Sequence, residues 1–176
     1  MSSLILSILN VVKIDNRVTF VSGCWQNKAS KNNHKEDPTP RYTYPIGPIQ
    51  LAAGKLFKKQ FANFPEEDQN AIDAFLMHVE IYGFDGKLPG RNKPSWDVPA
   101  NDPQFITKVD FARQHNLHHY HVGIPFYDDV NETGLGQVSG YVLHYQLFEN
   151  EFGPVLKVVD YGLHPPFDLP KEPYLE

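Results

Sequence analysis

Residues 65–83, PEEDQNAIDAFLMHVEIYG, decide the fold class because they carry the clearest helical pattern of the chain. Proline suits the first position of a helix, and the acidic residues that follow it suit the positive end of the helix dipole. Apolar residues then follow the i, i+3, i+4, i+7 spacing of one helix face: Ile72, Phe75, Leu76, Val79 and Tyr82. Gly83 is a typical C-terminal stop. The spacing therefore predicts one amphipathic helix.

A shorter helical segment precedes this helix. Residues 55–61 place Leu56, Phe57 and Phe61 on one side and lysines on the other. Two adjacent amphipathic helices joined by a short connection predict an αα-hairpin. Strand-like segments follow the pair, at 105–112, 117–124, 140–148 and 155–161. Mostly short connections would join them as an antiparallel meander, and helices followed by a meander predict an α+β domain.

The chain divides into an N-terminal extension and a folded unit. Residues 1–25 are apolar and β-branched and predict a strand-like hairpin, while residues 26–48 predict a polar, proline-rich linker. Residues 49–176 form the predicted domain. Inside that domain, residues 83–104 are rich in Gly and Pro and predict a long loop. The loop carries a basic cluster: Lys87, Arg91 and Lys93.

Composition excludes several classes of protein. A chain of 176 residues with 41% hydrophobic and 13% aromatic residues can bury a core, which excludes wholesale disorder, collagen and coiled coil. A net charge of −5 excludes a uniformly basic nucleic-acid coat, although residues 1–64 hold nine Lys/Arg against three Asp/Glu. A single cysteine excludes a disulfide framework and a Cys-based zinc site. No apolar run approaches the roughly 20 residues of a membrane span, so we expect a soluble, cytoplasmic protein.

Histidine is the residue that indicates chemistry. Six of the eight histidines lie between residues 115 and 164. Strand alternation places His119 and His121 on one face of their strand, and His144 lies in the middle of the next one. His164 follows the last strand, where a loop could fold it over the sheet. Tyr145 and Tyr161 are candidate neighbours.

Imidazoles gathered in this way suit RNA cleavage without a metal. A base must remove the 2′-OH proton, cations must stabilise the phosphorane, and an acid must protonate the leaving 5′-oxygen. Imidazole can lend or take a proton near neutral pH. Lys108 and Arg113, from the preceding predicted strand, are the candidate fixed cations. This mechanism requires the rings to converge on an open hollow that RNA can reach.

Two other interpretations of the histidines stay open. A His-x-His pair in a strand is often a structural pair held by backbone groups or carboxylates. A third histidine beside such a pair can also make a zinc or iron site. The carboxylate that such metal motifs place a few residues later is absent, since the next acids are Asp128 and Asp129. We therefore predict no metal ligand and no cofactor.

The order of several short strings resembles a family of bacterial toxins. The strings LFKKQF (56–61) and PEEDQ (65–69), followed by the helix of Ile72, Phe75 and Leu76, resemble the opening of RelE/ParE-superfamily toxins. More specifically, four later strings look like the YafO family: GKLPG (86–90), HYHV (119–122), VLHY (142–145) and DYGLH (160–164). The YafO family consists of ribosome-associated mRNA interferases from type II toxin–antitoxin pairs. The resemblance covers about residues 49–168.

The resemblance implies a fold and a function. It implies two helices packed on one face of an antiparallel sheet of about four to five strands, with the other face binding RNA. It implies an endoribonuclease that inhibits translation, with mRNA, free or on the ribosome, and a cognate antitoxin as partners. Reactive groups of that family come from the middle strands and from the segment after the last strand. These positions correspond here to His119, His121, His144, Tyr145 and His164.

The sequence therefore predicts a complete set of site residues. His119 and His121 are the predicted acid/base pair, and His144 and His164 would stabilise phosphate or carry protons. Tyr145 and Tyr161 would stack on a base or orient the phosphate. The predicted RNA-binding cations are Lys108, Arg113, Lys87, Arg91 and Lys93. The alternative is a non-catalytic protein-binding module, because the ParE branch of the superfamily acts on DNA gyrase and is not a nuclease.

Overall fold

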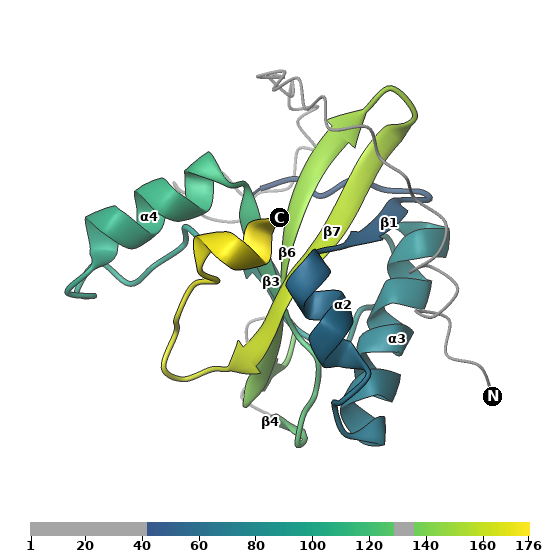
Figure 1. Cartoon of the computed structure of the whole chain (residues 1–176), viewed down its shortest axis with the longest axis horizontal. Helices are drawn as coiled ribbons and strands as arrows, with labels where there is room; N and C mark the ends of the chain where they lie inside the picture. Colours follow the sequence, from purple (N-terminus) through teal and green to yellow (C-terminus); the bar gives the residue numbers. More distant parts are fainter. Residues whose placement is uncertain (1–41, 129–135) are drawn as a thin grey trace, which may run out of the picture.

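The computed structural model describes residues 42–128 and 136–176 (Figure 1). The predicted hairpin 1–25 and most of the predicted linker lie outside these residues. The elements are, in chain order, β1 (Gln50–Ala53), α2 (Lys55–Phe61), α3 (Glu66–Tyr82), β2 (Asn92–Pro94), α4 (Phe105–Gln114), β3 (Leu117–His121), β4 (Tyr127–Asp128), β5 (Val138–Ser139), β6 (Tyr141–Asn150), β7 (Gly153–Leu163) and the 3-10 helix η1 (Glu172–Leu175).

A five-stranded sheet forms the centre of the molecule, in the order β1-β7-β6-β3-β2. β1 runs parallel to β7, and the other neighbouring pairs are antiparallel. The antiparallel run β3-β6-β7 comes from the last three predicted strand segments. Strands β4 and β5 make a separate small pair. The structure therefore confirms the predicted α+β class, with a sheet that is mostly antiparallel.

Helices α2 and α3 cover one face of this sheet and bury the larger core. Phe57, Ile72 and Phe75 pack in one cluster with the inward side chains of β3, β6 and β7. Phe75 stacks on Tyr120, with 4.1 Å between the ring centroids. The apolar stripe that predicted the α3 helix is thus the stripe that binds the sheet. The predicted helix pair is confirmed.

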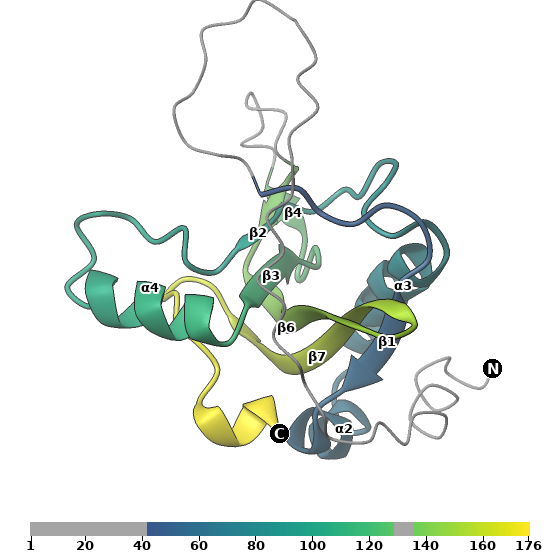
Figure 2. The same cartoon turned by 90° about the horizontal axis from the view of Figure 1, so that it is seen from above.

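Residues 105–112 form helix α4, so the strand predicted there is wrong. The apolar residues of this segment fit both an alternating and a helical spacing. The buried pair is Val109 and Ala112, three residues apart, which is a helical spacing. Asn116 ends the turn that follows with a φ of 47°, a conformation that asparagine tolerates better than most residues. Figure 2 shows α4 on the opposite side of the sheet from α3.

The second face of the sheet has a smaller core. Ala112, Leu117 and Val159 form it, with Leu169 and Leu175 of the C-terminal segment packed against them. The register pairs His144 with Asp160 and Tyr145 with Val158, which leaves Val159 as an extra residue of β7. Such a bulge turns a side chain to the other face. Neighbouring valines therefore serve different cores, because Val158 belongs to the larger one.

The Gly- and Pro-rich residues 83–104 include a short edge strand, β2, that pairs with β3. A Cβ at Gly90 would lie 1.8 Å from the carbonyl oxygen of His121 and 2.8 Å from the ring of Tyr120. Only glycine allows the backbone to pass β3 this closely. Pro94 is tolerated because an edge strand leaves its outer backbone positions unpaired.

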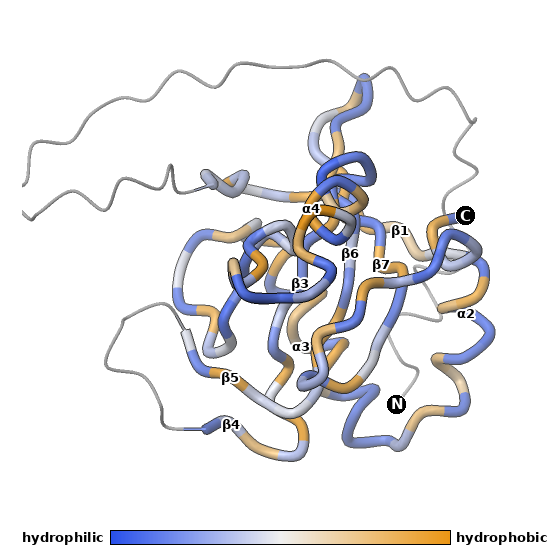
Figure 3. Tube along the Cα trace, turned by 90° about the vertical axis from the view of Figure 1, so that its left-hand side faces the viewer, coloured by the Kyte–Doolittle hydropathy of each residue, from blue (hydrophilic) through white to orange (hydrophobic). Residues whose placement is uncertain are grey.

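Hydrophilic and hydrophobic residues alternate along much of the tube in Figure 3, as expected of elements with one buried side. None of the helices in the ranges 42–128 and 136–176 combines the length and the apolar character that crossing a membrane would require.

Candidate functional site

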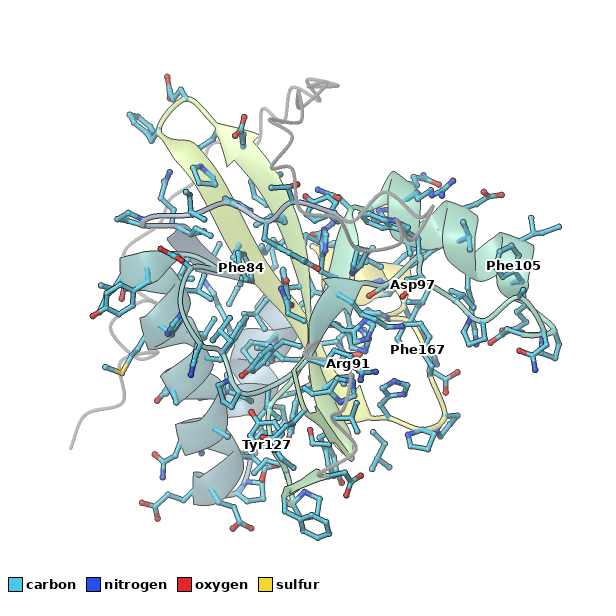
Figure 4. All side chains as sticks on the ribbon, turned by 180° about the vertical axis from the view of Figure 1, so that it is seen from behind. Phe84, Arg91, Asp97, Phe105, Tyr127 and Phe167 are labelled. Atoms are coloured by element: carbon cyan, nitrogen blue, oxygen red, sulfur yellow. The ribbon has the colours of Figure 1, made fainter. Side chains whose placement is uncertain are left out.

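Four histidines meet on the second face of the sheet, and we call them the histidine cluster: His119, His121, His144 and His164. The centroid of the His119 ring lies 5.9 Å from that of His121, 6.0 Å from that of His144 and 5.8 Å from that of His164. The rings of His121 and His164 are 5.2 Å apart. Figure 4 views this side of the molecule and labels Arg91, Asp97 and Phe167 in the same region.

The backbone explains why the four rings meet. Alternation in β3 places His119 and His121 on one face, and the register of β3 with β6 sets His144 directly opposite His119. The backbone N–H of His164 donates to the carbonyl of Gly140 at 2.8 Å, which fixes the chain beyond β7. Three separate stretches of chain thus supply one site.

The cluster is covered and does not line an open hollow. His119 is fully buried, and His121 and His144 are each 3% exposed. His164 is half-buried and is the most exposed ring of the four. The ring of Phe167 packs 4.9 Å from His119 and 5.1 Å from His164, measured between centroids. The expected convergence is therefore present, whereas the expected open hollow is covered by the C-terminal segment.

Burial keeps these imidazoles neutral. Desolvation, with the neighbouring His144 next in effect, holds the pKa of His119 well below its usual range. Burial also lowers the pKa of His144 to about 3 and that of His121 to about 4. The pKa of His164 is lowered by burial and by the charge of Lys93. At neutral pH the cluster is a set of uncharged rings that can accept a proton only weakly.

Two serines hold the rings of β3 in place. The Oγ of Ser95, a fully buried residue, lies 3.0 Å from Nδ1 of His119. The carbonyl oxygen of Ser139 lies 3.0 Å from Nδ1 of His121, and the backbone nitrogen of Ser139 lies 2.9 Å from the same atom. These contacts occupy the Nδ1 side of both rings, so the Nε2 atoms are the ones directed away from the serines.

Several polar atoms at the cluster are buried with no hydrogen-bond partner among the described residues. They are Nε2 of His119, Nδ1 of His144, Nδ1 of His164 and Nε of Arg91. A buried polar atom without a partner costs about 1–3 kcal/mol, so most native structures contain few of them. Ordered water or a bound ligand would satisfy these atoms.

The cluster also has the composition of a metal site. His119, His121 and His164 each offer one ring nitrogen, and these three nitrogens lie within 4.8 Å of one another. Neutral imidazole nitrogens are common ligands of zinc, copper, nickel and iron.

Two of the predicted cations lie next to the cluster, and a third lies behind Phe167. Lys93 pairs with His119 in the β2–β3 register, and the carbonyl of Arg91 accepts from the backbone N–H of His121. The charges of both side chains reach His121 and lower its pKa. Lys108 donates to Asp102 and to the carbonyl of Phe167, and its Nζ lies 5.9 Å from the centre of the Phe167 ring.

Other predicted site residues do not reach the cluster. Tyr145 is fully buried in the core beneath α3, and its hydroxyl donates to Asn92. Tyr161 lies on the same side, where its hydroxyl donates to Asp68. Lys87 and Arg113 are exposed, in the turn before β2 and at the end of α4. Tyr145 fails as a site residue because adjacent residues of β6 point to opposite faces.

Sequence reasoning missed Ser95, Ser139 and Phe167. The two serines contact histidines only because β2 and the β4–β5 pair lie beside β3, and no spacing in the sequence indicates those contacts. For Phe167 the sequence gives a weak indication: it lies three residues after His164, beyond two prolines, and so must lie near that histidine.

No protein-family model, no curated protein and no solved structure matches the chain. Its function must therefore be inferred from the site itself.

Proposed function

We propose that this protein is an endoribonuclease that cleaves mRNA and inhibits translation, as the toxin of a type II toxin–antitoxin pair. The observation that carries the proposal is the convergence of four imidazoles from three stretches of chain beside two cations. Phe167 covers these rings, so the proposed reaction requires the C-terminal segment that carries Phe167 to move away and admit the RNA. A structural role alone would not require ring nitrogens that are buried without a partner.

The charges around the cluster favour an anionic substrate. Arg91 and Lys93 flank the rings, and Nε of Arg91 is one of the buried donors without a partner within the described ranges. Among the described residues, the ion pair of Lys93 is with Asp97, whose side chain is 68% exposed. A phosphodiester would satisfy the free donor and would be held by charge-assisted hydrogen bonds. This arrangement fits the phosphate of RNA better than a neutral substrate.

The aromatic contact of the proposed site is Phe167. It packs on three rings of the cluster and is itself half-buried. Single-stranded RNA is usually held by bases stacked on aromatic side chains. We therefore assign to Phe167 the stacking role that the sequence suggested for Tyr145 and Tyr161.

The proposed reaction is an internal transfer. His164 takes the proton of the 2′-OH, the 2′-oxygen attacks the adjacent phosphorus, and the bond to the 5′-oxygen breaks as that oxygen takes a proton from water. The products are a 2′,3′-cyclic phosphate and a 5′-hydroxyl. His164 is the proton carrier nearest to solvent, while Arg91 and Lys93 stabilise the charge that develops on phosphorus.

The test is RNA cleavage by the purified full chain in the presence of a chelator. Wild-type protein should convert a synthetic RNA, or mRNA in a translation reaction, to fragments with cyclic phosphate ends. His164→Gln should reduce the cleavage rate by about a hundredfold or more. His115→Gln is the matched control, because the His115 ring packs on Phe111 away from the cluster.

Two results would overturn the proposal. One is the absence of cleavage by wild-type protein both on free RNA and during translation. The other is a folded His164→Gln protein that cleaves at the wild-type rate. Cleavage restricted to the translation reaction would assign the enzyme to the ribosome-dependent kind. In cells, expression should stop growth unless the antitoxin is also made.

A second candidate function is a non-catalytic module that binds a protein partner. Helix α3 presents Met77, Ile81 and Tyr82 to solvent, with exposed fractions of 43%, 52% and 56%. A shallow hollow of about 220 Å³ lies beside them, lined by His78, Tyr82, Asp85 and Gly86. Exposed apolar side chains beside a hollow suit a protein surface. This candidate would be favoured if the protein did not cleave RNA, and if wild-type protein arrested growth whereas the Ile81→Asp variant did not.

A further inference from the structure

Three imidazoles of the histidine cluster are close enough to share one ion. The candidate ligand nitrogens of His119, His121 and His164 lie within 4.8 Å of one another. Ligands about 2.1 Å from a tetrahedral zinc ion are about 3.4 Å apart. To bind one ion, the three nitrogens would therefore have to move closer together by up to about 1.4 Å.

The free nitrogens mark where an ion would sit. Nε2 of His119 and Nδ1 of His164 are buried and have no hydrogen-bond partner in the part of the chain that the structure describes. His119 is fully buried, so bulk solvent does not reach this nitrogen. A metal ion bound between the rings would satisfy these nitrogens together.

Hydrogen bonds on the far sides of the rings favour the ligand form. Nδ1 of His119 can donate to Ser95 Oγ, which leaves a lone pair on Nε2. Nδ1 of His121 faces both the N–H of Ser139, from which it can accept, and the carbonyl of Ser139, to which it can donate; the metal-binding form of this ring is the one in which Nδ1 donates to the carbonyl. Metal-binding histidines almost always donate their second ring N–H in this way. Burial also keeps both rings neutral, which is the state that binds a metal.

We propose that His119, His121 and His164 bind one divalent transition-metal ion of the zinc type. Three nitrogen ligands leave a fourth position for water or for a phosphate oxygen. The charges of Arg91 and Lys93 would repel a cation, so we expect moderate affinity. The inference goes beyond the proposed function and does not depend on it, because it concerns ion binding by the protein without RNA.

The test is titration of the metal-free full chain with cobalt(II), followed by visible absorption. One cobalt ion per chain should give the intense d–d bands of four-coordinate cobalt, and zinc should displace it. His119→Gln, His121→Gln and His164→Gln should each weaken binding by at least about tenfold, a loss typical even of outer contacts of a metal site. His115→Gln should bind cobalt as wild-type protein does.

A further variant keeps the test valid if substitution of a buried histidine prevents folding. Ser95→Ala retains all three rings and removes only the hydrogen bond to His119, so it should fold and bind cobalt about tenfold more weakly. No cobalt spectrum from wild-type protein would overturn the proposal, as would unchanged binding by folded His164→Gln and Ser95→Ala proteins. RNA cleavage in the presence of a chelator tests the proposed nuclease, and cobalt binding without RNA tests the proposed metal site. Either proposal can therefore fail while the other holds.

Discussion

His119 of β3 and His144 of β6 lie directly opposite each other in the central sheet, with 6.0 Å between ring centroids. Both side chains are buried, and each has one ring nitrogen with no hydrogen-bond partner within residues 42–128 and 136–176. Burial and the neighbouring imidazoles lower the pKa of both rings, and no carboxylate of the described residues offsets this effect. The pair therefore belongs to the folded state as neutral imidazoles, and protonation opposes folding.

Stability should accordingly fall in mild acid. Burial lowers the pKa of His118 and of His144 to about 3 in the folded protein, whereas an unfolded histidine titrates near 6.5. Below about pH 6.5 the unfolded chain binds more protons, so the stabilisation present at higher pH is lost as the pH falls toward 3. Each of these two histidines should lower the free energy of unfolding by about 2 kcal/mol when the pH falls from 7.5 to 5. Urea unfolding in chelator at both pH values measures this loss.

His118→Phe serves as the partner variant for the pH experiment. His118 lies between aromatic rings, stacked 5.4 Å from Tyr145, so phenylalanine should pack in its place. Between pH 7.5 and 5, this variant should lose about 2 kcal/mol less free energy of unfolding than wild-type protein, which is the contribution of one histidine. Equal urea midpoints for wild-type protein at the two pH values would contradict the neutral, buried state.

Ser95→Ala should destabilise the fold. Ser95 is fully buried, and its hydroxyl pairs with Nδ1 of His119. Alanine would leave that nitrogen without a partner, at a cost of about 1–3 kcal/mol in the free energy of unfolding. Thr107→Ala, at an exposed position of α4, should change it by less than about 0.5 kcal/mol. Equal effects of the two substitutions in urea unfolding would argue against the Ser95–His119 bond.

Tyr145→Phe should lower stability and leave RNA cleavage intact. The hydroxyl donates to Asn92 Oδ1 at 2.7 Å, on the face that α3 covers. Its loss should lower the free energy of unfolding by about 1–2 kcal/mol, since the acceptor on the half-buried Asn92 loses its partner. Cleavage per folded molecule should not change, because the histidine cluster lies on the other face. A large fall in cleavage by folded Tyr145→Phe protein would restore the role that the sequence assigned to this residue.

Gly90→Ala should disrupt the edge of the site. The added Cβ would meet the carbonyl oxygen of His121 at 1.8 Å, so β2 would have to move away from β3. We expect a loss of about 3 kcal/mol or more in the free energy of unfolding. Gly162→Ala is the matched control, because a Cβ there meets nothing within 4 Å. Similar thermal midpoints for the two variants would show that β2 does not pass β3 as closely as described.

Helix α4 shows where a local pattern is ambiguous. The apolar residues of 105–112 satisfy two periods over a segment too short to separate them. Tertiary contact decides between the periods: Ala112 packs in the second core, and Val109, three residues earlier, is buried on the same side of the helix. The stripe of α3 is longer and fits one period, which is why the sequence alone predicted that helix.

The sequence by itself determined the α3 helix, the last three strands of the predicted meander and the placement of His119 and His121 on one face, because these follow from local periodicity and composition. Only the tertiary structure decided that His144 and His164 join them, that Tyr145 and Tyr161 do not, and that Phe167 covers the rings. Those outcomes depend on strand register, on the bulge at Val159 and on the path of the C-terminal segment. These are contacts between residues far apart in the chain, and no local spacing encodes them.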